Sequence, residues 1–293
     1  MSTLMRSTAL LLAGAAMAAA CAKVPYTGRQ QYNLIPDVLM RGIGKSTYGV
    51  MIGEAKVKKK GEDNDILQDV GAKISKVADQ PKYDWEFTLI DSDELNAWCL
   101  PGGYIGFYSG ILPVLKNEAG MAFVMGHEVA HATAHHGAER LSQQLTLVGG
   151  LVGLELFMKD NTALKPKERQ VVLGALGVGA TVGVLLPFSR MHESEADTIG
   201  MMYMASAGYP PDESIKVWNR MDKEKDGVAL PAFISTHPSN KNRKENLREW
   251  LPKAEKRYAR NKLSKDTQVT LWDGKSGGGG SKDDGEPSVT KPK

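Results

Sequence analysis

The sequence contains one short motif whose residue types and spacing could bind a metal and activate water, His127-Glu128-Val129-Ala130-His131. Residues four apart share a helix face, so the imidazoles of His127 and His131 can reach one ion. Glu128 lies beside the first ligand and could act as general base for a zinc-bound water, whose pKa the metal lowers. The alternative is a helix with two incidental histidines. The clustering of histidines counts against it, because the chain has six and five of them are His127, His131, His135, His136 and His237.

A catalytic zinc needs a third protein ligand, and the best candidates follow Ser189 and Arg190 in the chain. Glu193 and Asp197 are again four apart and would share a helix face. One carboxylate could bind zinc while the other accepts the outer N–H of a ligand histidine and fixes its ring. A solvated acidic helix face is the alternative interpretation.

The remaining titratable residues near these motifs are weaker candidates. His135 continues the four-residue series but lies one turn too far along to share an ion with His127 and His131, so we interpret it as a core residue or a partner of a ligand. We expect His136 and His192 to be surface or structural residues. Glu195 points away from the face of Glu193 and is a weaker ligand candidate.

These motifs resemble those of the M48 (Ste24-like) family of gluzincin metallopeptidases. The resemblance is carried by HExxH at 127–131, followed by Ser189-Arg190, Glu193 and Ala196-Asp197. Three further segments agree with it and extend it over most of residues 25–250. The first is Asn96 to Tyr104, which is similar to the edge strand and hairpin of the family. The second is Thr27-Gly28-Arg29-Gln30, which is similar to the mature start of its periplasmic lipoprotein members. The third is Ser235 to Ser239 followed by Arg243, which is similar to its C-terminal His-Pro element.

The resemblance implies a role for each matching residue. His127, His131 and Glu193 would bind one zinc ion per chain, and Glu128 would be general base and later proton donor. Asp197 would orient a ligand. His237 would either stabilise the developing oxyanion or occupy the fourth position of zinc and hold the enzyme off. The strand at 97–100 would pair with an extended peptide substrate.

The elements that must position these residues can be predicted from periodicity. We expect helices at about 64–78, 110–115, 118–145, 189–222 and 240–256, a strand at 85–90, and a strand pair at 97–100 and 104–108. The predicted fold class is α+β and mainly α-helical, a gluzincin-type domain with a small antiparallel sheet or hairpin beside the zinc-binding helix.

Two stretches, 145–157 and 171–188, are almost free of charge. They could form a transmembrane hairpin, a pair of buried or groove-lining helices, or helices that dip into a bilayer. Glycines interrupt both stretches and the first is short for a span, so we favour the buried or groove-lining pair. Their predicted place is inside a peptidase domain at 46–256.

The N-terminus has the pattern of a secretory signal peptide over 1–20, with Arg6 before a short apolar run and small residues before Cys21. Cys21 resembles the lipidated cysteine of a bacterial lipoprotein, and Ala22 after it favours the outer membrane. Plain secretion is the alternative. Residues 21–45 would form a lipid-anchored tether and N-terminal segment. Residues 257–293 would form a largely disordered tail. Cys99 would make no disulfide.

Composition excludes little else. The net charge of the 293 residues is +3, and no Arg-rich run is interleaved with aromatics, so we expect no nucleic-acid partner. The favoured function is a zinc endopeptidase of the bacterial envelope acting on unfolded or extended polypeptides. A zinc-containing chaperone or assembly factor with latched proteolysis, which would have envelope assembly partners, is the alternative. A structural lipoprotein with an incidental motif is a third.

Overall fold

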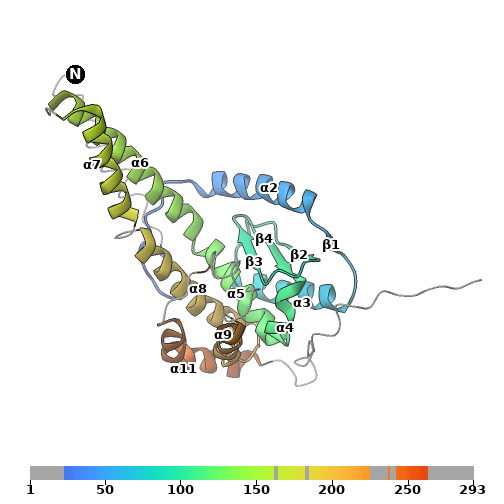
Figure 1. Ribbon diagram of the computed structural model, residues 1–293. Helices are drawn as coiled ribbons and strands as arrows, with labels where there is room; N and C mark the ends of the chain where they lie inside the picture. The colour runs from blue at the N-terminus through green and yellow to red at the C-terminus, as the bar shows by residue number, and fades with distance from the viewer. Residues whose placement is uncertain (1–22, 162–163, 182–184, 225–236, 238–241, 263–293) are drawn as a thin grey trace, which may run out of the picture.

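The computed structural model describes residues 23–161, 164–181, 185–224, 237 and 242–262. The expected signal peptide, Cys21 and the tail beyond residue 262 lie outside the described residues. Helices dominate, with one small sheet between them (Figure 1). The helices are Asp37–Glu54 (α2), Glu62–Ala78 (α3), Ser109–Ile111 (η1, a 3-10 turn), Leu112–Leu115 (α4), Glu118–Thr133 (α5), His136–Asn161 (α6), Pro166–Ala180 (α7), Leu186–Ser206 (α8), Glu213–Glu224 (α9) and Arg243–Asn261 (α11).

The sheet has four strands in the order β1-β2-β4-β3, with bounds Val57–Lys58, Glu86–Ile90, Ala97–Leu100 and Tyr104–Tyr108 for β1 to β4. The hairpin of β3 and β4 is antiparallel and has the predicted bounds. The sheet as a whole is mixed rather than antiparallel, because β2 runs parallel to β4. After β2 the chain crosses to form β3 one strand position away, and the hairpin turn then brings β4 back between β2 and β3. This topology leaves β3 at an edge of the sheet.

The centre of the fold is α5, which is buried along nearly its whole length. Its first turn is capped by the side chain of Asn117, which accepts a hydrogen bond from the backbone N–H of Gly120 at 2.8 Å. It packs against α3 on one side and α8 on the other. The α5–α8 contact is close enough for backbones to touch, since a Cβ on Gly200 would lie 2.6 Å from the backbone nitrogen of His127. Only glycine at 126 and 200 permits this approach.

Two of the predicted helices are each interrupted by a turn. The expected helix at 118–145 ends at Thr133 and a new helix, α6, begins at His136. His135 has a φ of 48°, in the left-handed region, which redirects the chain between the two helices. The expected helix at 189–222 is likewise divided into α8 and α9, where Gly208, with a φ of 90°, and two prolines end the helical pattern.

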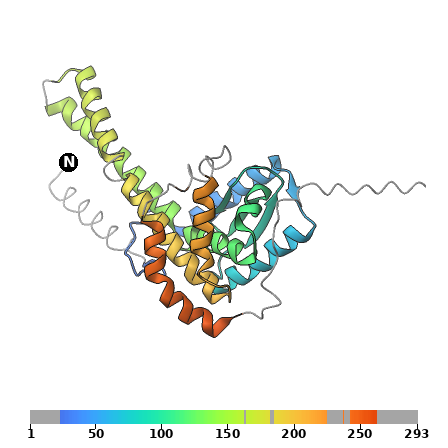
Figure 2. The same cartoon turned by 60° about the horizontal axis from the view of Figure 1, so that its bottom comes forward.

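The helices α6 and α7 lie side by side and project away from the rest of the described chain as an arm (Figures 1 and 2). We call residues 145–180 of these helices the arm. Of the favoured alternatives, buried or groove-lining helices, the buried one is wrong, because α7 has no buried residue and the apolar side chains of α6 beyond residue 144 are mostly exposed. Periodicity identified helices here, but glycine-rich apolar helices give no sign of which face has a protein partner. The segment His136–Lys159 is long and apolar enough to cross a membrane, with 11% of its apolar window buried.

The N-terminal segment packs onto the helical layer before α2 begins. Lys23 and Gln30 form an isolated bridge, and the side-chain amide of Gln31 donates to the carbonyl oxygen of Ala134 at the break between α5 and α6. The helix α2 covers part of the sheet beside β3 and was not predicted. Residues 23–34 therefore support the break that separates α5 from α6.

Candidate metal centre

The structure brings four of the predicted site residues together. Donor atoms of His127 and His131 on α5, Glu193 on α8, and His237 all lie within 4.8 Å of one another. The Nε2 atoms of His127 and His131 are 3.1 Å apart, and Glu193 approaches them at 3.5 and 3.4 Å through its two oxygens. Donors bound to a tetrahedral zinc lie about 3.3–3.4 Å apart, given bonds of roughly 2.0–2.1 Å. The three donors therefore have both the chemistry and the spacing that a zinc ion requires.

The outer nitrogen of His127 is held by Asp197, as the second carboxylate of α8 was expected to do. His127 Nδ1 lies 3.0 Å from Asp197 Oδ1. Burial disfavours charge on both groups, but the contact with Asp197 and Glu193 raises the pKa of His127 to about 9. Burial would also raise the pKa of Asp197, yet Arg243 and His127 hold it below its ordinary value.

Arg243 is a member of the site that the sequence did not assign a role. Its side chain is 2% exposed and donates through Nε and Nη2 to the two oxygens of Asp197 at 2.5 and 2.8 Å. Its Nη1 lies 3.2 Å from Glu193, and its guanidinium stacks over the ring of Trp218 at 4.0 Å. The only sequence signal was its position shortly after His237 in the family-like C-terminal element. Arg243 offsets the charge of two buried carboxylates and fixes their orientation.

Glu128 is buried beside the donor cluster and has an environment suited to a general base. Burial is the main cause that raises its pKa above the ordinary value of a glutamate, while His237 and His127 oppose the shift. A carboxylate with a raised pKa accepts a proton more readily at neutral pH. The backbone of Cys99 on the edge strand β3 also opposes this rise of the pKa.

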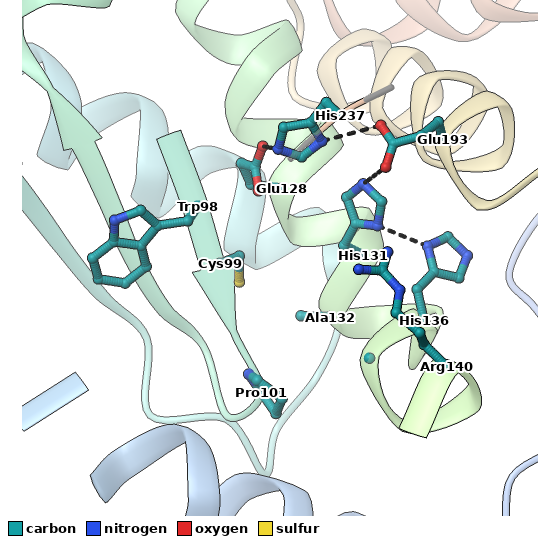
Figure 3. Close-up of a pocket in the computed structure, with 11 residues that line it drawn as sticks. Trp98, Cys99, Pro101, Glu128, His131, Ala132, His136, Arg140, Glu193 and His237 are labelled. Atoms are coloured by element: carbon teal, nitrogen blue, oxygen red, sulfur yellow. Dashed lines mark hydrogen bonds and ion pairs between the residues drawn. The ribbon is translucent and has the colours of Figure 1, made fainter. Parts of the chain in front are cut away.

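His237 reaches the same cluster from a segment whose neighbouring residues lie outside the described ones. Its Nδ1 is 3.0 Å from Glu193 Oε2 and 3.2 Å from His127 Nε2. Its Nε2 is 3.3 Å from Glu128 Oε1 (Figure 3). One nitrogen of this imidazole therefore turns toward the donor cluster and the other toward the candidate base.

A cavity of about 200 Å³ opens beside these residues, between the edge strand β3 and the helices α5 and α6. It is lined by Trp98, Cys99, Pro101, Glu128, His131, Ala132, His136, Gly137, Arg140, Glu193 and His237. Cys99 is half-buried here as a free thiol. The cavity joins the free edge of the sheet to the donor cluster, as binding of an extended chain would need.

A second polar cluster lies behind the metal centre, and we call it the rear cluster: Arg29, His136, Glu139, His192 and Glu195. His136 and His192 are 1% exposed, so of the two expected alternatives, surface or structural residues, the structure supports the structural one. Their rings stack at 4.3 Å. Glu195 turns to this cluster and away from the metal donors, as its position off the Glu193 face indicated.

Arg29 connects the two carboxylates of the rear cluster. Its guanidinium donates to both oxygens of Glu139 at 2.9 and 2.8 Å, and its Nε donates to Glu195 at 2.9 Å. Burial would raise the pKa of Glu195, but hydrogen bonds from His136, Arg29 and Thr27 lower it to about 2. The same kind of contacts, from His192 and Arg29, hold the pKa of Glu139 well below its ordinary value. Burial, in contrast, lowers the pKa of His136 to about 4, so this imidazole is neutral at pH 7.

His135 is the one histidine that neither cluster includes. It lies in the turn between α5 and α6, and its Nδ1 is 3.8 Å from Asp37. It lies too far along the chain to share the ion, as expected, but the expectation of a core residue or a partner of a ligand is wrong, because its side chain is 27% exposed and faces Asp37.

The sequence matches the family model for peptidase family M48 over residues 62–251. It is 36% identical over 244 residues to the mitochondrial metalloendopeptidase OMA1 of Saccharomyces cerevisiae, covering 80% of this chain and 63% of that protein. It is 28% identical to human OMA1 over 78% of this chain and 46% of the relative. The match to the β-barrel assembly-enhancing protease of Escherichia coli is 28% identical and covers 62% and 37%. The chain thus spans less than two thirds of the length of each of these three.

The rear cluster generates a prediction about stability. We expect Arg29→Met to lower the free energy of unfolding by about 2–3 kcal/mol at pH 7, because two largely buried carboxylates lose their shared cation. The loss is no larger because Arg29 itself is partly exposed, and solvent screens its interactions. Since the pKa of Glu195 is lowered from 4.5 to about 2, the folded state binds fewer protons than the unfolded state between these values. The stabilisation is therefore full above about pH 5 and decreases as the pH falls below 4.5.

Urea unfolding of wild type and variant, both in chelator and at a series of pH values, measures this difference. The difference between the two proteins should shrink as the pH falls. Arg41→Met is the matched control, since Arg41 pairs with Asp37 at 2.9 Å on the surface, and it should cost less than about 1 kcal/mol without this pH dependence. A difference for Arg29→Met that stays constant down to pH 3 would contradict the prediction.

Proposed function

The chain belongs to peptidase family M48, a family of metalloendopeptidases, and on that premise we propose that it is a zinc-dependent endopeptidase of the bacterial cell envelope that cleaves misfolded or damaged envelope proteins. The observation that carries the enzymatic part is the convergence of His127, His131 and Glu193 beside the buried carboxylate of Glu128. Three donors and an adjacent base are the composition of a catalytic rather than a structural zinc site.

Each residue near the cluster has a part in the proposed hydrolysis. Zinc, when bound by His127, His131 and Glu193, supplies a water of lowered pKa and a Lewis acid for the scissile carbonyl. Glu128 accepts the proton of the attacking water and returns it to the leaving amine. Asp197 and Arg243 hold His127 and Glu193 in orientation from behind.

The edge strand β3 supports a polypeptide substrate in extended conformation. An edge strand has unpaired backbone groups to which a peptide can add as a further strand. Trp98, Cys99 and Pro101 line the cavity from this strand and its turn, while Glu128 lines it from α5. An added strand would therefore pass the donor cluster. Recognition through backbone groups favours unfolded chains over folded ones, which agrees with a role in removing damaged proteins.

Two features support a place at a membrane of the envelope. The first is the sequence pattern of a signal peptide before Cys21, which we propose is lipidated and anchored in the outer membrane. The second is the arm, whose large apolar side chains are mostly exposed. Beyond the arm and the adjoining Leu164 and Leu186, the described chain exposes five large apolar side chains. One is Leu34, and four lie on α2: Val38, Leu39, Ile43 and Val50. We propose that the arm lies in the membrane surface and holds the peptidase there.

His237 favours a second candidate function, in which proteolysis is latched and the protein acts mainly as a zinc-containing assembly factor. Its Nδ1 is placed as a fourth donor would be, and its Nε2 contacts the base Glu128. A ligand in the fourth position would exclude the attacking water. Movement of His237 would then be needed before substrate could be cleaved.

Cleavage of casein by the purified protein tests the proposed chemistry. We expect one zinc per chain, activity that a chelator removes and added zinc restores, and a loss of about 10²–10⁴-fold in Glu128→Gln with zinc retained. Glu118→Gln, at the start of the same helix and outside the site, is the matched control and should leave cleavage unchanged. Retained activity in Glu128→Gln would refute the assigned base.

The same assay separates the two roles of His237. If His237 is a latch, His237→Ala should remove the inhibition and casein cleavage should increase. A loss of about 10²–10³-fold would instead identify it as an oxyanion stabiliser. Absence of cleavage in both proteins, with intact zinc, would favour the binding function over the peptidase.

Flotation with vesicles of phosphatidylethanolamine and phosphatidylglycerol tests the arm. The protein should carry Cys21→Ser, so that no lipid anchor contributes. We expect Val171→Asp with Val178→Asp to weaken vesicle binding by at least about tenfold, because two apolar side chains that are 72% and 65% exposed become charged. The control pair on α2, Val38→Asp with Val50→Asp, changes side chains that are 64% and 65% exposed and should have little effect. Equal losses in both pairs, or no binding by the starting protein, would contradict the proposal.

A further inference from the structure

The two candidate histidine ligands are held from behind by different kinds of group. The outer nitrogen of His127 contacts a carboxylate, Asp197, at 3.0 Å. The outer nitrogen of His131, Nδ1, contacts instead another imidazole, that of His136, at 2.9 Å (Figure 3). We propose that His136 is a positioning residue for the zinc ligand His131, and that it is itself oriented by Glu195 and the N-terminal residues Thr27 and Arg29. The inference rests on the proposed function, since it takes His131 as a ligand.

The direction of the hydrogen bonds follows from the metal-facing nitrogen. Nε2 of His131 is the atom that approaches His127 and Glu193, so its lone pair is the one available to zinc. The proton of His131 then lies on Nδ1 and must be donated to Nδ1 of His136. His136 carries its own proton on Nε2 and donates it to Glu195, which is 3.1 Å away. Each ring nitrogen in this series of hydrogen bonds thus has one role. The opposite tautomer of His136 would place its Nδ1–H against the Nδ1–H of His131, so that two donors would meet.

The carboxylate at the end of this chain of hydrogen bonds is fixed by the N-terminal segment. The hydroxyl of Thr27 donates to one oxygen of Glu195 at 2.5 Å and the guanidinium of Arg29 donates to the other at 2.9 Å. The ring of His192 stacks on His136 at an interplanar angle of 14°, and Glu139 holds His192 at 2.9 Å. His136 therefore has no freedom to rotate away from His131.

The turn between α5 and α6 makes the contact possible. Residues five apart on a continuous helix point about 140° away from each other, given 100° per residue, and cannot meet. The left-handed conformation of His135 ends α5 and starts α6 in a new direction, which returns His136 to the side of His131. Gln31 binds the carbonyl of Ala134 within this turn. The geometry thus brings together a ligand and its support that the sequence separates onto different helix faces.

Two amide substitutions at 136 test the proposal, because each keeps a different half of the imidazole. The side chain of Asn can replace Nδ1 and accept from His131, whereas that of Gln reaches the place of Nε2 and keeps the contact with Glu195. We expect His136→Gln to weaken zinc binding by about 10–100-fold and to change the visible spectrum of the cobalt-substituted protein. His136→Asn should bind zinc several-fold more tightly than His136→Gln and keep a spectrum like that of wild type. Zinc affinity is measured by competition with a chromophoric chelator.

The control is Glu213→Gln, which alters a buried carboxylate on α9 that pairs with Arg220 at 2.8 Å and belongs to neither the donor cluster nor the rear cluster. It should leave zinc affinity within about threefold of wild type, even where urea unfolding shows a similar loss of stability. Glu195→Gln, which keeps an acceptor for His136 but removes the charge, should give an intermediate affinity and serves if His136→Gln does not fold. Equal zinc affinities in the Asn and Gln variants, or wild-type affinity in Glu195→Gln, would overturn the inference. Wild-type protein without stoichiometric zinc would instead overturn the proposed function on which it rests.

Discussion

The backbone contact between α5 and α8 is the constraint on which the rest of the structure depends. Gly126 and Gly200 let the two helices approach until a Cβ on either would collide with the other backbone. At this separation the side chains of His127 on α5 and Glu193 on α8 meet directly, and no loop is needed to bring them together. A wider spacing, as two ordinary side chains would impose, would move the donors apart by more than a metal–ligand bond tolerates. The site is therefore built on rigid elements, and its precision comes from helix packing.

That contact also buries more negative charge than the fold can neutralise by itself. Glu128, Glu193 and Asp197 are three buried carboxylates, and Arg243 is the one buried arginine among them. The two negative charges left over would be balanced by one divalent cation. The raised pKa of His127, to about 9, shows how strongly the cluster favours positive charge at this point. Charge balance and donor spacing thus lead independently to the same kind of ion.

Much of the metal centre could be predicted from sequence because its spacing is local. Four-residue spacing on α5 and again on α8 identified His127, His131, Glu193 and Asp197, and strand periodicity identified the hairpin of β3 and β4 with its observed bounds. Pairing the two helices needed the resemblance to the family. Asp197 was identified as a support, but Arg243 and His136 were missed, because they reach the site through long-range packing and a helix break that no periodicity shows. The exposure of the arm was missed for a similar reason, since hydrophobicity specifies burial but not whether protein or lipid provides it.

The N-terminal segment links the proposed membrane anchor to the chemistry. Thr27 lies six positions after Cys21, a span of at most about 20–22 Å when fully extended. Thr27 and Arg29 hold Glu195, and through His136 they reach the candidate ligand His131. With the lipid at Cys21, the metal centre would thus be fixed close to the membrane surface by the same segment that orients it. Substrates would then be reached where unfolded chains approach the membrane, and an enzyme released from the anchor upstream of Thr27 would keep its site intact. Anchoring would set location, while the contacts of residues 27–31 would set geometry.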